Sequence, residues 1–489
     1  MTPSPNIAVE AAPIAWTRRR MTLVAAVFVY AILGYAISTN MLVPLLPSVE
    51  KAYRMNAVLA TWVTLSTLLA GALFVPSLCR IGDLLARRKQ ILLVSLGAVA
   101  IGGAIDALSD SVPLLLSGRA LTGIGAAAMP MMSGIVAEVF PEGPRKVTIA
   151  LTGSGLFTGA GGGGVLASLV IERPDGFRLL FWLIAAISAL AVLLVAAGVP
   201  KTGRPAATRP PLLDLPGAIG FVLPVTALLI AFSYATEWGW SSPRFIGLVL
   251  IGIALLPVWV VIQLRRRAPL VDMVVFLSRP VWTANVVSVL VGFAIFGSIS
   301  SASTLIQLPP VPGLGGQGAS VLVATLVVLP AEMMIVWMAP IVGYLTRRIG
   351  KGFFLMTGPL VQCVGYLVLL ADHGSVGAIL LAVSVIGTGT GLVGPAWGLV
   401  YVEDVAPEHV GRVYGNAPIL SQGVGGSISG AVFAAILTYR HLPELPLPAE
   451  SAFRTFWWLA VAATLAAACV GAVYLRTYGR VSVVNRTER

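Results

Sequence analysis

Fourteen apolar segments, each long enough to cross a lipid bilayer as a helix, divide this chain almost from end to end. A membrane-spanning helix needs about 20 mostly apolar residues. Charged residues are only 11% of the chain, whereas soluble domains carry about 25%. The sequence therefore predicts an all-α membrane protein with 14 transmembrane helices in the lipid bilayer. The segments are 22–47, 57–78, 90–109, 113–137, 147–171, 178–199, 213–236, 243–263, 281–306, 319–345, 353–371, 376–402, 413–438 and 455–475.

Basic residues are concentrated in alternate connections between these segments. If the N-terminus lies in the cytoplasm, the inner connections and tails hold 24 Lys and Arg residues and the outer connections hold 7. Cytoplasmic loops of membrane proteins carry such an excess, so we expect both termini in the cytoplasm. The net charge of +12 follows from this rule and does not indicate a nucleic-acid partner. The excess of Arg over Lys suggests a bacterial protein, which would lie in the plasma (inner) membrane.

A shift of 264 positions lays part of the chain over itself. Gly123 falls on Gly387, and Gly159 falls on Gly423. The shift spans an even number of segments, so the two copies share one orientation. Such repeats, related by an axis along the membrane normal, are found in secondary transporters. We therefore expect two six-helix bundles plus two inserted helices, with a substrate site between the bundles.

This repeat divides the chain into five expected regions. They are an N-terminal tail (1–21), an N-terminal six-helix bundle (22–199), a linker with two inserted helices and a re-entry segment (200–280), a C-terminal six-helix bundle (281–475) and a second cytoplasmic tail (476–489).

No group of residues is arranged for covalent chemistry. The three cysteines lack the paired spacing of a disulfide or metal framework, and no clustered nucleophile or phosphate-binding loop is present in the sequence. We therefore expect a protein that is not an enzyme and needs no metal or cofactor. The expected two-bundle fold can work as a monomer.

Two basic loops occupy matching places in the two copies. The loop RIGDLLARRK (80–89) resembles the signature loop of the major facilitator superfamily in its acid and its basic run, although three other positions depart from the family pattern. The resemblance implies a cytoplasmic gate, in which a charge cluster breaks when the halves move. An ordinary basic cytoplasmic loop is the alternative. The gate residues would be Asp83, Arg87, Arg88, Arg347 and Arg348.

The fourth and fifth segments carry further motifs of this family. LLLSGRALTGIGAAAMP resembles the family's motif around an intramembrane arginine, here Arg119, with Thr122 in place of a glutamine. GLFTGAGGGG (155–164) resembles the antiporter motif, with Ala160 in place of its proline. Glycines at such density allow helices to approach closely in lipid. The helix-packing residues would be Gly155, Gly159, Gly163, Gly164 and, in the second copy, Gly423.

Other stretches resemble the fourteen-span drug/proton antiporter branch of the superfamily. The resemblance implies export of lipophilic small molecules against a proton gradient, which would be the energy source. One departure concerns the first span, where the branch often carries an aspartate and this chain has Ser38. The stretches are GFRLLFW (176–182), LDLPG (213–217), EWGWSS (237–242) and APLVDMVVF (268–276).

Two acidic residues are candidates for proton coupling. Glu332 alone lies deep in an apolar segment, and intramembrane ionisable residues are functional candidates by default. Asp106 lies near the outer end of the third segment and is the weaker candidate. The alternative for Glu332 is a structural role, with a hydrogen bond across a helix interface.

The substrate cavity would contain Arg119, Trp397 and Tyr35. An arginine within a span normally faces a partner or a watery cavity, and aromatic rings can pack against a lipophilic substrate. The alternative for Arg119 is a structural arginine whose side chain snorkels toward the membrane surface, and the alternative for the two aromatic residues is packing or anchoring at the membrane interface. The sequence thus favours a proton-coupled exporter, and the absence of the first-span acid leaves open an uncoupled facilitator or importer with the same fold.

Overall fold

A computed structural model describes residues 17–478 apart from 56, 86, 171, 172, 174, 175, 201–214, 267–272, 312–314, 404–423, 440, 443 and 444. The N-terminal part contains α1 (Arg18–Asn40), α2 (Leu42–Tyr53), α3 (Ala57–Leu84), α4 (Arg88–Leu108), α5 (Val112–Ile124), η1 (Gly125–Ala127), α6 (Ala128–Val139), α7 (Glu142–Val170) and α8 (Gly176–Gly198). The rest contains α9 (Leu215–Trp238), α10 (Pro243–Arg265), α11 (Met273–Phe276), α12 (Arg279–Gln307), α13 (Val321–Ile349), α14 (Lys351–Ala371), α15 (Val376–Glu403), α17 (Ser427–Tyr439) and α18 (Glu450–Tyr478). Strands β1 (His441–Leu442) and β2 (Leu445–Pro448) form a small antiparallel hairpin in which Leu442 pairs with Leu445.

The predicted all-α membrane architecture is confirmed. Eleven helices of the described chain are long and apolar enough to cross a membrane, and each of the fourteen apolar segments overlaps a described helix. The count of fourteen crossings stays a prediction. Two segments are divided in the structure. The first is divided at Met41 into α1 and α2, and the fourth is divided into α5 and α6 by the 3₁₀ turn at Gly125–Ala127.

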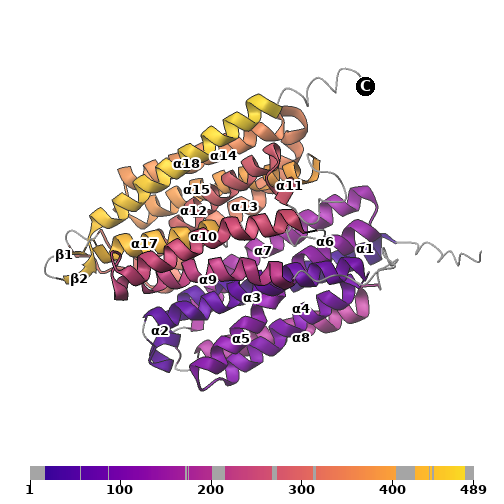
Figure 1. Cartoon of the computed structure of the whole chain (residues 1–489), viewed down its shortest axis with the longest axis horizontal. Helices are drawn as coiled ribbons and strands as arrows, with labels where there is room; N and C mark the ends of the chain where they lie inside the picture. The colour runs from indigo at the N-terminus through magenta and orange to yellow at the C-terminus, as the bar shows by residue number, and fades with distance from the viewer. Residues whose placement is uncertain are drawn as a thin grey trace, which may run out of the picture.

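The helices form two bundles with the same internal packing. In the N-terminal bundle α4 packs against α5 and α8, and α1 packs against α7 and α8. In the C-terminal bundle α14 packs against α15 and α18, and α12 packs against α17 and α18. Figure 1 shows the indigo and purple N-terminal helices on one side and the orange and yellow C-terminal helices on the other. The inserted pair α9 and α10 pack against each other, and α9 also touches α3.

One contact occurs twice at the spacing of the sequence repeat. Gly123 on α5 lies against the backbone of Thr67 on α3, and Gly387 on α15 lies against the backbone of Ala331 on α13. The glycines are 264 positions apart, and so are their two partners. The internal repeat therefore describes a packing arrangement as well as a similarity of sequence, because each copy places a glycine where two helix backbones meet.

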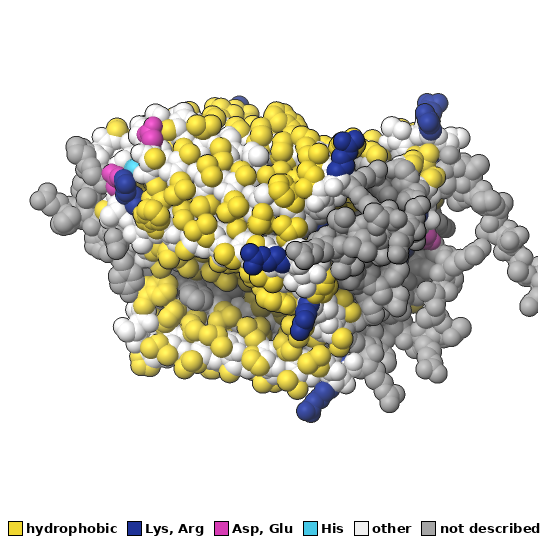
Figure 2. All heavy atoms as spheres, turned by 90° about the horizontal axis from the view of Figure 1, so that it is seen from above, with side chains coloured by type: hydrophobic (Ala, Val, Ile, Leu, Met, Phe, Trp, Pro, Cys, Tyr) yellow, Lys and Arg dark blue, Asp and Glu magenta, His cyan; other side chains and the backbone are white. Residues whose placement is uncertain are grey.

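Apolar side chains cover much of the outside of the molecule as well as its core. Phe28 and Phe181 are fully buried in one half, and Phe456 and Trp457 in the other. Figure 2 shows apolar side chains across the middle of one face, with charged side chains toward its ends. Most of the basic ones are gathered toward the end where α18 finishes. An apolar middle with charged ends suits a molecule that crosses a bilayer.

Candidate functional site

Helix α7 lies at the interface between the two bundles, because it packs against α1 in its own half and against α13 in the other. The contact between α7 and α13 is called the seam below. The glycines of α7 divide between these two neighbours. Gly155, Gly159 and Gly163 lie against Ile32, Leu33 and Ile37 of α1. A side chain at Gly159 would meet the carbonyl oxygen of Leu33 at 2.6 Å, so the two backbones approach too closely for any larger residue.

The second glycine face of α7 meets the C-terminal half. A methyl group on Gly164 would lie 2.9 Å from Thr325 Cγ2, and one on Gly161 would lie 2.5 Å from Leu329 Cδ1. Gly162, between them in sequence, has no atom within 4 Å of such a methyl group. Of the predicted helix-packing residues, three thus face α1 and Gly164 faces α13, whereas Gly423 lies outside the described residues.

Glu332 lies on α13 at this seam. A methyl group on Gly161 would be 3.6 Å from Glu332 Cβ and 3.7 Å from Cγ, so the stem of the acid rests on the glycine face of α7. The side chain is half-buried. Among the described residues, no hydrogen bond or ion pair reaches its carboxylate. A carboxylate in such a position is costly to keep charged and can hold a proton instead.

Asp106 and Arg119 form a second polar centre, enclosed within the N-terminal bundle. The side chains are 0% and 1% exposed. Arg119 Nε donates to Asp106 Oδ2 at 2.6 Å, and the Nη2 group forms an ion pair with the same oxygen. The guanidinium also lies over the Phe181 ring, 4.8 Å from its centroid. The other carboxylate oxygen, Oδ1, has no partner in the described part of the chain.

Ser38, the serine of the first span that stands where the branch often carries an aspartate, contacts this pair. Arg119 Nη1 donates to the carbonyl oxygen of Ser38 at 3.3 Å. The arginine therefore contacts the backbone of the first span at Ser38, and its carboxylate partner comes from α4. Because the guanidinium is enclosed in this state, the assignment of Arg119 to a substrate cavity stays a prediction.

The two aromatic candidates lie in different halves. The Tyr35 ring packs against Gly125, at the 3₁₀ turn that divides the fourth segment. Trp397 on α15 packs on the edge of a buried cluster that contains Val281 and Val393. Both side chains are half-buried. They do not belong to one cluster of side chains, and their assignment to a common cavity stays a prediction.

The predicted gate residues are only partly described. Arg87 is exposed. Arg88 donates to Glu138 Oε2 at 3.0 Å and to the carbonyl of Gly134 at 3.3 Å, both on α6 of its own half. Arg348 donates to the hydroxyl of Tyr344, one turn earlier in its own helix. The side chains of Asp83 and Arg347 lie outside the described residues, so the gate between the halves stays a prediction.

Sequence reasoning missed the partners of several of these residues. Glu138 gave no signal, since an acid at the end of an apolar segment is commonplace. Gly161 belongs to the glycine run and matches Gly425 in the repeat, but its orientation toward Glu332 required the structure. Within the described part of the chain, no group of three or more His, Cys, Asp or Glu residues is placed to hold a metal ion.

Comparison with known proteins gives consistent matches. The model of the Major Facilitator Superfamily matches residues 27–430. Multidrug resistance protein Stp of Mycobacterium tuberculosis (strain ATCC 25618 / H37Rv) is 27% identical over 82% of this chain and 73% of its own length. Multidrug transporter protein MdtP of Bacillus subtilis is 25% identical over 80% and 73%. The tetracenomycin C resistance and export protein of Streptomyces glaucescens is 25% identical over 81% and 72%.

A solved structure supports the same fold. The human organic anion transporter MFSD10 (TETRAN) aligns with 91% of this chain and 99% of its own, with a TM-score of 0.59 and 17% sequence identity. At that identity the likeness concerns the arrangement of helices and not the substrate.

Proposed function

Because this chain belongs to the major facilitator superfamily, we propose that it exports lipophilic small molecules from a bacterial cell in exchange for protons. Two of the relatives described above are named as multidrug proteins and a third as an export protein for tetracenomycin C. These names support a substrate class of drugs or secondary metabolites. The proposed location is the plasma membrane, with both termini in the cytoplasm, as the distribution of basic residues indicates.

The observation that carries the proposal is the position of Glu332 at the seam. When protonated, the side chain is neutral and can stay between α7 and α13. When ionised, it requires water or a polar partner, which favours separation of the two helices. Proton binding and release at this one carboxylate would therefore bias the seam between closed and open arrangements, which is what coupling in alternating access requires.

The substrate would bind between the bundles, with Tyr35 and Trp397 as the aromatic contacts from the two halves. On the cytoplasmic side Asp83 and the arginines of both basic loops would form a latch. Asp106, paired with Arg119, is a second candidate for proton coupling, because its unpartnered oxygen can accept a proton. A protein of this kind needs no cofactor and can work as a monomer, with the proton gradient as its energy source.

The test uses inverted membrane vesicles that contain the full-length protein and have an acidified lumen. Cationic, neutral and anionic drugs are added in turn, and the pH of the lumen is followed. Export in exchange for protons makes the lumen more alkaline. We expect this response from wild type and from Asp372→Asn, a control at an exposed carboxylate after α14, and a loss of it in Glu332→Gln.

Downhill flux of the same drug shows which variants are folded. Glu332→Gln should retain that flux while it loses the proton response. A full proton response in Glu332→Gln would remove this residue from the mechanism. Flux without any proton response in wild type would instead favour an uncoupled facilitator, the alternative that the Ser38 departure left open.

A further inference from the structure

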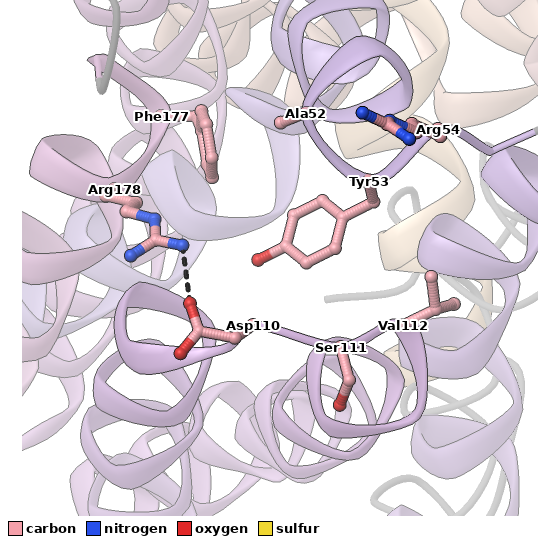
Figure 3. A pocket seen from close by; sticks show the side chains of 8 residues that line it. All are labelled: Ala52, Tyr53, Arg54, Asp110, Ser111, Val112, Phe177 and Arg178. Atoms are coloured by element: carbon pink, nitrogen blue, oxygen red, sulfur yellow. Dashed lines mark hydrogen bonds and ion pairs between the residues drawn. The ribbon is translucent and has the colours of Figure 1, made fainter.

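A pocket of about 310 Å³ opens at one end of the N-terminal bundle, away from the seam. Figure 3 shows the Tyr53 ring pointing across its centre, with Arg54 on one side and Arg178 on the other. Its lining residues come from the end of α2, the turn between α4 and α5, and the start of α8. They are Ala52, Tyr53, Arg54, Asp110, Ser111, Val112, Phe177 and Arg178.

The pocket walls are held by interactions between these three elements. The Tyr53 hydroxyl donates to the carbonyl of Ser109 at 2.8 Å, and its ring packs edge-on against Phe177. Arg178 Nη2 donates to the same Ser109 carbonyl at 3.2 Å and to Asp110 Oδ1 at 2.8 Å. The site is therefore assembled before any ligand arrives, which lowers the entropy that a ligand must lose on binding.

The location of the pocket excludes it from the transport route proposed above. All its lining residues precede position 199 and belong to one half, so the pocket cannot open and close as the halves separate. Helix α4 ends at Leu108 and α5 begins at Val112, so the pocket lies at the end of the bundle where the chain turns from one spanning helix into the next. At this depth a bilayer presents its polar head groups.

The surroundings of the pocket are apolar and exposed. Leu108 is 61% exposed beside the α4–α5 turn, and Leu179, next to Arg178, is 50% exposed. Exposed leucines at the ends of spanning helices lie where the acyl chains meet the head groups. A molecule bound here would thus have its polar part among the arginines and an apolar surface directly beside it.

The charge of the pocket favours an anion. Asp110 is 84% exposed and offsets Arg178, but no ion pair involving Arg54 is present among the described residues. Glu50 and Lys51 both lie about one helical turn before Arg54, and their opposite charges offset each other, so Arg54 supplies the net positive charge at this wall. Arg54 is also the one non-glycine residue in the described chain with a positive φ, of 52°. This left-handed conformation ends α2 as its C-cap, where the Arg54 N–H donates to the carbonyl oxygen of Glu50.

We propose that this pocket binds the phosphate group of an anionic phospholipid, with Arg54 and Arg178 as its ligands. Guanidinium groups suit phosphate because they offer paired N–H donors in a planar fork. The apolar leucines beside the pocket accept the acyl chains, which distinguishes a lipid from free phosphate. The site is independent of the proposed exchange of drugs for protons, and it would hold lipid whether or not transport is coupled.

The test measures lipid binding by native mass spectrometry of the full-length protein in detergent. Phosphatidylglycerol, phosphatidylcholine and inorganic phosphate are compared on wild type, Arg54→Gln and Arg244→Gln. Arg244 is a matched control, because it is exposed at the start of α10, on the same predicted outer side. We expect phosphatidylglycerol to bind wild type most strongly and Arg54→Gln to weaken its binding at least about tenfold, while Arg244→Gln has little effect.

A second variant guards against misfolding of the first. Ser111→Asp adds a negative charge to the pocket at the N-cap of α5, a position where aspartate stabilises a helix. It should also abolish binding of phosphatidylglycerol. Equal loss in Arg54→Gln and Arg244→Gln, or full binding to Ser111→Asp, would overturn the assignment to this pocket. Equally tight binding of inorganic phosphate would show an anion site and overturn the assignment to a lipid.

Discussion

Glu332 on α13 rests against Gly161 on α7, across the seam between the two bundles. The acid comes from the C-terminal half and the glycine from the antiporter-like motif of the N-terminal half. The contact joins two features that the sequence presented separately, and it makes the size of residue 161 a determinant of how the acid is seated.

Substitution of Gly161 should impair transport more than the same substitution of Gly162, the next residue in the sequence. A valine there would press on Leu329 and Glu332, and overpacking of this kind typically costs about 1–3 kcal/mol. Because this strain arises only when the seam is closed, we expect Gly161→Val to lower the population of the closed state at least about fivefold, the factor to which about 1 kcal/mol corresponds, and to lower drug export with it. Gly162→Val, at a position with no atom nearby, should stay within about twofold of wild type. Export assays on matched amounts of membrane protein would decide between them, and equal activity of both variants would contradict the contact.

The protein should be more stable with the buried pair of Asp106 and Arg119 intact than with either partner replaced. Removal of one member of a buried ion pair typically costs about 3–5 kcal/mol, because a charge is left without compensation. We therefore expect Asp106→Asn and Arg119→Gln each to lower the thermal unfolding temperature in detergent clearly. The double variant should recover part of that loss. Additive losses in the double variant would show that the two side chains do not depend on each other.

The repeated glycine contact predicts parallel effects in the two halves. Gly123→Val and Gly387→Val each force a side chain into the backbone of a neighbouring helix, α3 or α13, which cannot move aside as a flexible side chain can. Both should reduce the amount of folded protein. Gly394→Val on α15 is the control, because no atom lies near that position. Fluorescence size-exclusion profiles would report the outcome, and normal folding of either glycine variant would contradict the close approach.

The Tyr53 hydroxyl should stabilise the protein at neutral pH and lose that effect in strong alkali. Burial raises the pKa of Tyr53 above its ordinary value of 10.0, so the hydroxyl stays protonated and donates to Ser109 at lower pH. A group whose pKa is raised by folding contributes its stability below the unfolded pKa and loses it as pH rises through the folded one. Tyr53→Phe should therefore cost about 1 kcal/mol at pH 7, and the difference from wild type should shrink above pH 10. Unfolding temperatures at several pH values would test this, and a constant difference would contradict it.

How much could be predicted from the sequence depended on whether a residue differs from its neighbours. Glu332 and Arg119 were identifiable because a charged side chain contrasts with an apolar run. The direction in which the α7 glycines face was not, since a helix in lipid is apolar on its lipid side and on its protein side alike. Asp106 and Arg119 were both singled out, but their pairing depends on the antiparallel register of α4 and α5.

Little in the sequence indicated the pocket around Tyr53, because only Phe177 and Arg178 of its lining belong to a stretch that resembles the branch. Tyr53 and Ser109 are 56 positions apart, and neither belongs to a motif of the family. Their contact follows from the position in which α2 ends beside the α4–α5 turn, which only the tertiary fold determines. The gate loop shows the opposite case, because its motif was recognisable while two of its side chains lie outside the described residues.

The glycine face of α7 also bears on the energy needed to switch between states. On the α7 side the contact is made by glycine backbone, and on the α13 side by the side chains of Thr325 and Leu329. Such contacts are weak and short-range, and at these positions α7 has no side chain to interlock with α13. At these glycines, separation of α7 from α13 therefore breaks dispersion contacts. At such a contact a single ionisable group can shift the balance between two conformations, because each dispersion contact contributes only about 0.1–0.2 kcal/mol.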